Sequence, residues 1–508
     1  MRTLSLSLFI AALAASARAQ DLTEAYNLSN TTALGTARSI GFGGALGSIG
    51  GDFGVISVNP AGLGIYRTSE IAATPSLRMN YSTSAFQGNT TTDNGTDRTL
   101  NHVGMVLTEA PKGKRYDRRK WKSAAFAFGM NRIADLTGNY NYSGANYSSS
   151  ASLLFEADAN RTPANLDAPG SLAYMGSKAH LLTHPLTSYY TAVPFSGGIT
   201  QSNIVSERGG INELVVALGG NYKERILIGA TLGFPVFRYH RISDYTETVL
   251  PGNTNNLAGF SSFTYNNDLS INGSGVNLKL GTILKLTNFF RIGAAFHTPT
   301  IYTLSEVTDY GISSVVGGNR YSLSTANILP QQRFDYSFIT PYKAVLSASL
   351  VIKKLGFVTA DYEVVDYSTM QFRYQSGTDA SGTSNRVLEN NMNNSIRATY
   401  QAATNIRLGA EIKLGKSFMA RAGAGYYSNP YKTGPSMERF DVSAGLGFRT
   451  KHFFADFGLL NSTYKFSELA YSDVDYRYVA TANSGALAPM ATVQPVTNNV
   501  ALTVGFKF

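Results

Sequence analysis

The sequence lacks several features that mark common protein classes. Among its 508 residues there is no cysteine and one tryptophan, and no apolar run of about 20 residues follows the first 20. The missing cysteines exclude a disulfide framework, a thiolate metal site and c-type haem attachment. A membrane helix needs about 20 consecutive apolar residues, so we expect none after residue 20.

Residues 1–19 have the layout of a cleaved secretory signal peptide. Arg2 supplies the positive start, an apolar run extends from Leu4 to Ala15, and Ala17, Arg18 and Ala19 form a small-x-small cleavage site. The run is too short to span a bilayer of about 30 Å as a helix. We therefore expect the chain to be exported and cleaved after Ala19.

The chain is basic, and part of this charge lies in one short segment. Removing Arg2 and Arg18 with the signal peptide lowers the formal net charge from +10 to +8. Residues 112–120 contain six basic side chains and one acid. In an exported chain we interpret this segment as a solvated turn at a lipid headgroup boundary, and we expect no nucleic-acid partner.

What the sequence has in abundance is alternation with a period of two, together with 30 Tyr, 28 Phe and 49 Gly residues. Near the C-terminus, Val500, Leu502, Val504, Phe506 and Phe508 alternate with small or polar residues, and residues 406–414 and 440–448 repeat the pattern. Successive side chains of a strand point to opposite faces. One apolar face and one small or polar face fit a membrane barrel with lipid outside and a polar lumen.

The pattern predicts an all-β transmembrane antiparallel barrel of about fourteen strands over residues 67–508. Very short turns at 223–225, 287–288, 353–356, 415–416 and 450–451 alternate with long polar loops, a bacterial arrangement in which the long loops face outward. The longest loop, 143–210, is expected to hold a short helix near 171–183. The expected strands are 67–86, 98–110, 121–142, 211–222, 226–246, 260–286, 289–306, 333–352, 357–374, 395–414, 417–428, 438–449, 452–466 and 496–508.

Residues 20–66 do not alternate, and we expect them to fold into the lumen as a plug, called the hatch below. Eight glycines lie between Gly35 and Gly54. Their spacing does not match a dinucleotide fingerprint, and no Lys-Ser/Thr follows as in a P-loop. Glycine suits backbone that turns tightly where side chains do not fit.

Several of these residues resemble the FadL/TodX outer-membrane transporters of long-chain fatty acids and aromatic hydrocarbons. The similarity covers Gly35, Ala37, Arg38 and Asp52, the run from Ser57 through Asn59, Pro60 and Ala61 to Leu63, the segment 361–368, and the terminal Phe508. It implies a Gram-negative outer-membrane location, a hydrophobic small-molecule substrate, a monomer in contact with the bilayer and lipopolysaccharide, and no cofactor or metal. It also implies that the barrel-assembly machinery binds Phe508.

The resemblance further implies that a hatch movement releases substrate sideways at a kink in the third strand. Here Ala124, Phe126, Phe128 and Met130 keep one phase, and the run 131–135, which begins with Asn131 and Arg132, breaks it beside Gly129. A phase break beside glycine marks a bulge or bend, although an ordinary transition into a loop has the same pattern. The candidate gate therefore consists of Asn59, Pro60 and Ala61 with Gly129, Met130, Asn131 and Arg132.

Three other classes stay open at this point, among them a structural or adhesive barrel, which a flat rather than hollow lumen would indicate. A haem-binding receptor would use some of the six histidines, and His180 and His184 have i, i+4 spacing in a long loop. An outer-membrane enzyme would need a nucleophile and a positioned histidine, but no G-x-S-x-G or H-E-x-x-H motif is present. Hemin titration and hydrolase assays separate the latter two classes from a transporter.

Overall fold

The computed structural model describes residues 22–32, 34–111, 113–184, 187–352, 355–377, 384–432, 436–471 and 488–508. The expected signal peptide, residues 1–19, lies outside this range. Within the described residues, every helix is too short or too polar to span a bilayer.

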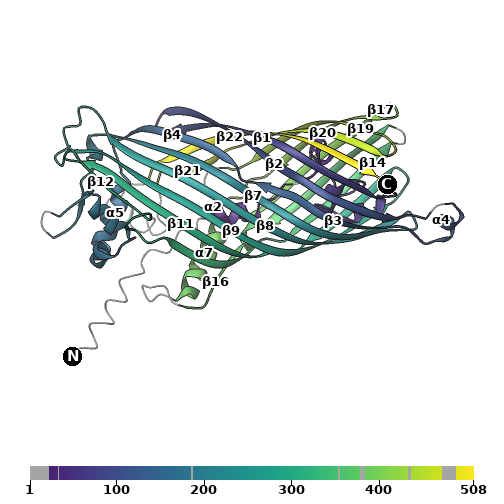
Figure 1. Cartoon of the computed structure of the whole chain (residues 1–508), viewed down its shortest axis with the longest axis horizontal. Coiled ribbons are helices and arrows are strands. Elements are labelled where there is room, and N and C mark those ends of the chain that lie inside the picture. The colour runs from purple at the N-terminus through teal and green to yellow at the C-terminus, as the bar shows by residue number, and fades with distance from the viewer. Residues whose placement is uncertain are drawn as a thin grey trace.

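The chain forms a closed antiparallel barrel of fourteen strands, which confirms the predicted fold (Figure 1). The first strand pairs with the last from Glu70↔Lys507 to Ala85↔Thr492, so the ring has no free edge. Closure satisfies the backbone groups that hydrocarbon cannot. Nine strands are continuous: β1 (Glu70–Phe86), β2 (Asn89–Glu109), β7 (Ile199–Tyr222), β8 (Ile226–Val249), β9 (Phe260–Lys285), β17 (Ala402–Leu414), β18 (Phe418–Tyr427), β19 (Arg439–Arg449) and β22 (Met490–Lys507).

Five further strands are each interrupted once and continue on the same side of their neighbours. They are β3 (Trp121–Asp135) with β4 (Gly138–Asn146), β10 (Phe290–His297) with β11 (Ile301–Val316), β13 (Gln332–Ile339) with β14 (Lys343–Ile352), β15 (Gly356–Asp366) with β16 (Gln371–Tyr374), and β20 (Phe453–Tyr464) with β21 (Phe466–Leu469). A short strand, β12 (Asn319–Ser324), pairs only with β11.

The predicted apolar faces point outward. Leu502, Phe506 and Phe508 are 46 %, 56 % and 65 % exposed, while Ala501 and Thr503 between them are buried. Leu408 and Ile412 likewise point outward, and Arg407 and Glu411 point inward. The wall is therefore apolar outside and polar inside, as a lipid-embedded barrel requires.

The predicted strand boundaries were wrong mainly where strands extend beyond the band of outward-facing apolar side chains. β7 begins at Ile199 rather than 211, within the predicted loop 143–210, and β2 begins at Asn89 rather than 98. The β2 extension is wholly polar and the β7 extension has only Ile199, Ile204 and Val205 among polar and glycine residues, so neither gives apolar alternation. Residues 395–399, predicted as strand, end the helix α7 (Asn385–Thr399).

The remaining helices lie in the connections. The predicted loop helix is present as α6 (Leu172–Lys178), and α5 (Ser152–Arg161) precedes it. Two short strands, β5 (Leu182–Thr183) and β6 (Tyr190–Thr191), and the turns η3 (Pro163–Asp167) and η4 (Phe195–Gly197) complete this loop. At the opposite end, α4 (Lys114–Arg118) projects beyond the barrel near the C-terminus (Figure 1). Another short turn, η5 (Tyr367–Thr369), joins β15 to β16.

The hatch lies inside the ring. It contains α2 (Leu22–Ser29), α3 (Ala37–Gly41), η1 (Phe53–Ser57) and η2 (Pro60–Ile65). Nearly every described hatch residue from Leu34 to Leu63 is buried. Its apolar side chains pack with inward-facing wall residues such as Val106, Ala127 and Val215.

Candidate functional site

The turn at residues 59–61 is anchored to the barrel wall through the Asn59 side chain. Asn59 caps η2, because its Oδ1 accepts from the Ala61 backbone N–H at 3.1 Å, and Pro60 occupies the first helical position. The Asn59 amide also donates to the Gly47 carbonyl at 2.6 Å and to the Thr282 carbonyl of β9 at 3.1 Å. It also donates to the Ala294 carbonyl of β10 at 3.4 Å, so one fully buried side chain joins two parts of the hatch to two neighbouring wall strands.

The wall behind this turn consists of inward-facing glycines, called the glycine patch: Gly219 of β7, Gly229 of β8 and Gly281 of β9. A Cβ added at Gly229 would lie 2.3 Å from the Pro60 carbonyl oxygen. A Cβ at Gly281 would lie 1.9 Å from Asn59 Oδ1, and one at Gly219 would lie 2.5 Å from Leu63 Cβ. Only glycine allows the hatch backbone to approach this closely.

The same close approach continues around the ring. Gly293 faces Gly47, Gly409 faces Phe42, Gly423 faces Gly43, Gly445 faces Gly41 and Gly458 faces Ala37. In each case the added Cβ would lie within 3.0 Å of the hatch. The hatch therefore rests against main chain over much of the bore.

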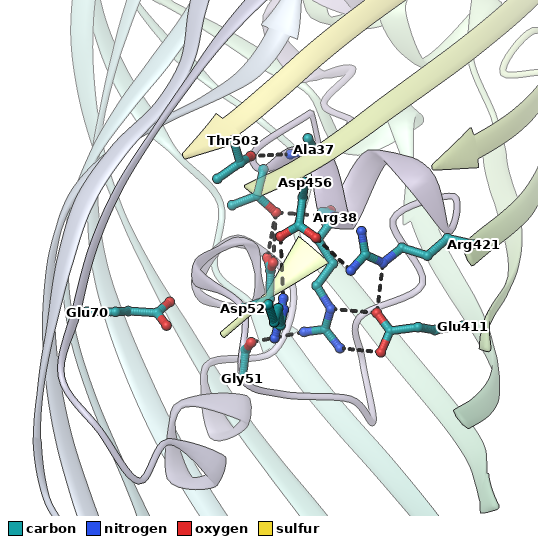
Figure 2. A network of polar contacts seen from close by, with 12 residues as sticks. Ala37, Arg38, Gly51, Asp52, Glu70, Glu411, Arg421, Asp456 and Thr503 are labelled. Atoms are coloured by element: carbon teal, nitrogen blue, oxygen red, sulfur yellow. Dashed lines mark hydrogen bonds and ion pairs between the residues drawn. The ribbon is translucent and has the colours of Figure 1, made fainter. Parts of the chain in front are cut away.

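Charged side chains hold the other flank of the hatch (Figure 2). Arg38 of α3 pairs with Glu411 of β17 at 2.9 Å, and Arg421 of β18 pairs with the same carboxylate oxygen at 2.8 Å. Arg421 also pairs with Asp456 of β20 at 2.7 Å. We call these four buried residues the ionic cluster. Arg38 is its only member from the hatch, and it also donates to the Gly51 carbonyl at 2.9 Å.

The third strand leaves its neighbour at the predicted phase break. The β2–β3 ladder runs from Glu109↔Ala124 to His102↔Asn131 and ends there. On its other side β3 stays paired with β7, with a bulge between Arg132 and Ala134. Arg132 braces the bend, since it pairs with Asp135 at 3.0 Å and donates to the Gly209 carbonyl at 2.6 Å.

Beyond the break, a seam separates residues 89–101 of β2 from β4. Both segments are fully described, and no backbone ladder joins them. Side chains bridge the seam instead: Asn89 donates to the Ser143 carbonyl at 3.2 Å, Thr91 to the Asn141 carbonyl at 2.5 Å, and Thr137 to Asp97 at 3.3 Å. Separating these strands would break a few side-chain contacts and no continuous ladder.

The hatch touches the wall at this break. The Asn131 amide donates to Ser57 Oγ at 2.9 Å, and the Thr32 backbone N–H donates to the Ile133 carbonyl at 2.7 Å. A Cβ on Gly129 would lie 2.8 Å from the Phe53 ring. The hatch residues at the break are therefore Thr32, Phe53 and Ser57.

The first helix of the hatch, α2, fills the next part of the lumen together with aromatic side chains. The Tyr26 ring lies 5.2 Å from that of Tyr367 and 6.3 Å from that of Tyr400, and the Tyr400 hydroxyl donates to the Leu22 carbonyl at 2.7 Å. Tyr26 and Leu28 are buried among inward-facing apolar residues of eight wall strands and of α7. At the outer end, α5 and α6 pack on Phe86, Tyr142 and Phe263 and cap the bore.

The six histidines do not gather. The ring of His180 stacks on Tyr321 at 3.9 Å and that of His184 on Tyr189 at 4.4 Å, and a strand at 182–183 separates them, so their helical spacing is not realised. His102 and His297 are buried in the wall beside Phe53 and the Val58 carbonyl. Within the described residues, no group of three His, Asp or Glu side chains has the arrangement of a metal site.

At the end of the barrel from which α4 projects, the Glu224 side chain contacts residues of three different segments. It lies in the β7–β8 turn, accepts from the Tyr116 hydroxyl of α4, and pairs with Arg67 at 2.5 Å and Lys285 at 2.9 Å. Burial alone would raise the pKa of Glu224, but these hydrogen bonds and positive charges outweigh it and lower the pKa to about 2. The carboxylate is therefore ionised wherever the barrel is folded near neutral pH.

The structure places the two halves of the predicted gate apart. Asn59, Pro60 and Ala61 contact β7, β8 and β9, whereas Gly129 and Asn131 contact η1 of the same hatch. Met130 pairs with Leu214, and Arg132 braces the bend. Sequence reasoning did not identify the ionic cluster or the glycine patch, although charged and glycine residues on the inward faces of strands were the available signal.

Comparison with known proteins shows the fold. No family model and no curated protein sequence matches the chain. Among solved structures, a Pseudomonas aeruginosa FadL homologue matches with a TM-score of 0.54 and 12% identity, covering 94% of this chain and 99% of that one. The P. putida toluene transporter TodX matches with a TM-score of 0.52 and 13% identity, over 94% and 99% of the two chains. The chain thus has the FadL/TodX fold over nearly its whole length.

Proposed function

We propose that this chain is an outer-membrane transporter for hydrophobic small molecules, which leave sideways at the break in the third strand. The observation that carries the proposal is the end of the β2–β3 ladder at Asn131, where Ser57 and Thr32 of the hatch contact the same strand. A hatch movement that broke these contacts would reach the seam between β2 and β4, where side chains rather than a backbone ladder join the strands.

The filled lumen supports a hydrophobic cargo. The hatch, including α2, and the outer cap occupy the same bore, so they leave no room for a permanently open, water-filled pore. A guest in this lumen would replace Tyr26 and Leu28 among aromatic side chains, which suits an acyl chain or an aromatic ring. Such a solute gains about 25 cal/mol per Å² of apolar surface removed from water, and a sideways exit leads it into lipid.

The seam offers a direct test, since the chain has no cysteine of its own. Cysteines replacing Asp97 and Thr137, whose side chains meet at 3.3 Å, allow the seam to be closed with a cleavable thiol crosslinker. We expect crosslinking to abolish uptake of fatty acid or toluene in a reporter strain lacking its own transporter, and reduction to restore it.

The matched control places cysteines at Thr246 and Thr264, a cross-strand pair of β8 and β9 within an intact ladder. Crosslinking this pair should leave uptake unchanged. Equal uptake before and after crosslinking of the seam would rule out sideways exit. If the uncrosslinked barrel took up neither fatty acid nor toluene, the proposed cargo would be contradicted.

A further inference from the structure

A groove of about 1000 Å³ opens on the outer surface of the barrel, near the end from which α4 projects. It lies across β2, β3, β7, β8 and β9. Large apolar side chains with outward exposure surround it: Leu107, Trp121, Phe126, Leu218, Ile228 and Leu280. Its volume is at the upper end of the range of about 300–1,000 Å³ typical of ligand pockets.

The groove exists because the outward row of side chains is interrupted. Ala124 of β3, Gly220 of β7 and Ala230 of β8 occupy outward positions between the larger residues, and Ala124 pairs directly with Gly220. Through this gap the groove reaches the backbone of Gly219, Gly229 and Gly281, the glycine patch against which the hatch rests from inside. The wall is only one backbone thick at this point.

One end of the groove meets a strongly basic turn, residues 113–122. Trp121 lines the groove. The turn contains six basic residues and a single acidic one, Asp117. Arg119 pairs with Glu109, another lining residue, at 2.8 Å. Lys114, Arg115, Arg118 and Lys120 are exposed and have no carboxylate partner among the described residues.

We propose that this groove and the basic turn together bind an anionic glycerophospholipid, with an acyl chain along the groove and the phosphate against the turn. An apolar hollow with cations at one end matches a lipid with an anionic headgroup. Trp121 lies between the two parts, at the level where tryptophan is enriched at membrane interfaces. The inference rests on the proposed membrane location of the barrel but not on transport.

Charge complementarity selects the occupant. A neutral lipid would fill the groove and leave Lys114, Arg115, Arg118 and Lys120 without a carboxylate partner in the described part of the chain. An anionic headgroup gains about fivefold in affinity for each nearby Lys or Arg. The groove surrounds lipid chains on a concave surface. A preference for one class of lipid is therefore expected here.

Trp121 is the only tryptophan of the chain, so its fluorescence reports this site alone. We would reconstitute the full barrel in vesicles of one fixed mixture of phosphatidylglycerol and phosphatidylcholine, with brominated acyl chains on one lipid or on the other. Bulk charge is then identical in both samples. Bromine on phosphatidylglycerol should quench Trp121 with at least about fivefold higher apparent affinity, and added salt should reduce the difference.

Two variants and their controls complete the test. Arg115→Gln/Arg118→Gln/Lys120→Gln should abolish the preference, and Ala124→Leu/Ala230→Leu should reduce quenching by both lipids. The first control is Lys413→Gln/Lys416→Gln/Lys451→Gln, which removes exposed lysines in or beside two other turns. The second is Ala348→Leu/Ala360→Leu on another lipid-facing part of the wall. Heat-modifiable migration on gels verifies folding.

Equal quenching by the two brominated lipids in the unaltered barrel would overturn the proposal, as would a preference that persists without the three cations. A positive result in a barrel that takes up neither fatty acid nor toluene would leave the lipid site standing while the transport proposal fails. The two proposals therefore fail separately.

Discussion

At the scale of single residues, the attachment of the hatch depends on a few buried side chains with several partners each. Glu411 accepts from Arg38 and Arg421, and Asn59 contacts both the hatch and β9. Removing one member of a buried ion pair leaves an uncompensated charge, which is far more destabilising than losing a surface pair. The ionic cluster is therefore where a small change should loosen the hatch most.

Glu411→Gln should loosen the hatch without opening the ring. The lost charge leaves Arg38 and Arg421 facing one another, and we expect the hatch attachment to weaken by about 3–5 kcal/mol. Ion conductance in planar bilayers should rise from near zero to frequent openings. Glu109→Gln, which removes an exposed partner of Arg119, is the control and should change little. Identical conductance of both variants would contradict this role.

The glycine patch gives a second residue-scale prediction. Gly229→Ala places a methyl group 2.3 Å from the Pro60 carbonyl, so the turn at 59–61 must move away from the wall. We expect faster proteolysis within the hatch of the folded barrel. Gly138→Ala, whose added methyl would have its nearest neighbour at 3.8 Å, serves as the control. Unchanged proteolysis of Gly229→Ala would show that the wall yields instead.

At the scale of elements, alternation predicted the strands because each wall strand has one face in lipid. It did not predict where strands end. The extension of β7 over 199–210 contains Glu207, Arg208 and two glycines, and both its faces lie beyond the band of outward-facing apolar side chains, so no periodic signal marks it. The break in β3 was predicted because the run from Asn131 to Asp135 breaks the apolar phase beside Gly129, and Arg132 occupies the next position of that phase after Met130.

The candidate site was predictable only in part, since its contacts are long-range. The hatch turn at 59–61 and the break at 129–132 were each identified locally, but which hatch residues meet which strand depends on the closure of the whole ring. Ser57 meets Asn131 across 74 positions and Arg38 meets Glu411 across 373. No local pattern in a single sequence specifies such pairs.

The turn joining β7 to β8 gives a pH prediction at this scale. Glu224 has a folded pKa of about 2, below the value of about 4.3 for an unperturbed glutamate, so ionised Glu224 stabilises the folded turn. This stability is present above about pH 4.3 and is lost as the pH falls towards 2. Because the side chain is 36 % exposed, solvent screening limits the effect to about 1 kcal/mol.

Pulsed proteolysis of the α4 turn measures this effect. Cleavage between residues 113 and 119 should increase between pH 4.3 and 2 in the unaltered chain. Glu224→Gln should show the faster cleavage already at pH 7, and little further increase on acidification. A Glu224→Gln variant that kept the original pH profile would assign the effect to another carboxylate.

At the scale of the whole molecule, the bore is closed in three successive layers. They are the outer cap, the hatch helix α2 with its tyrosines, and the rest of the hatch. Deleting residues 20–62 removes two of these layers and should change uptake. We expect faster entry of small polar solutes and loss of selectivity for hydrophobic cargo, measured in whole cells. Unaltered selectivity in a well-assembled deletion variant would locate the selective step in the outer cap.

The hatch is seated largely on bare main chain, and this has a mechanical consequence. If hatch and wall side chains interlocked there, they would have to change rotamers together before the hatch could move. Where the hatch rests on glycine backbone, no wall side chain has to change rotamer, so loss of the polar contacts of Asn59, Arg38 and Ser57 removes the main local barrier to displacement along the bore. Over this part of the wall the resting position is set mainly by polar contacts, and each can be weakened separately.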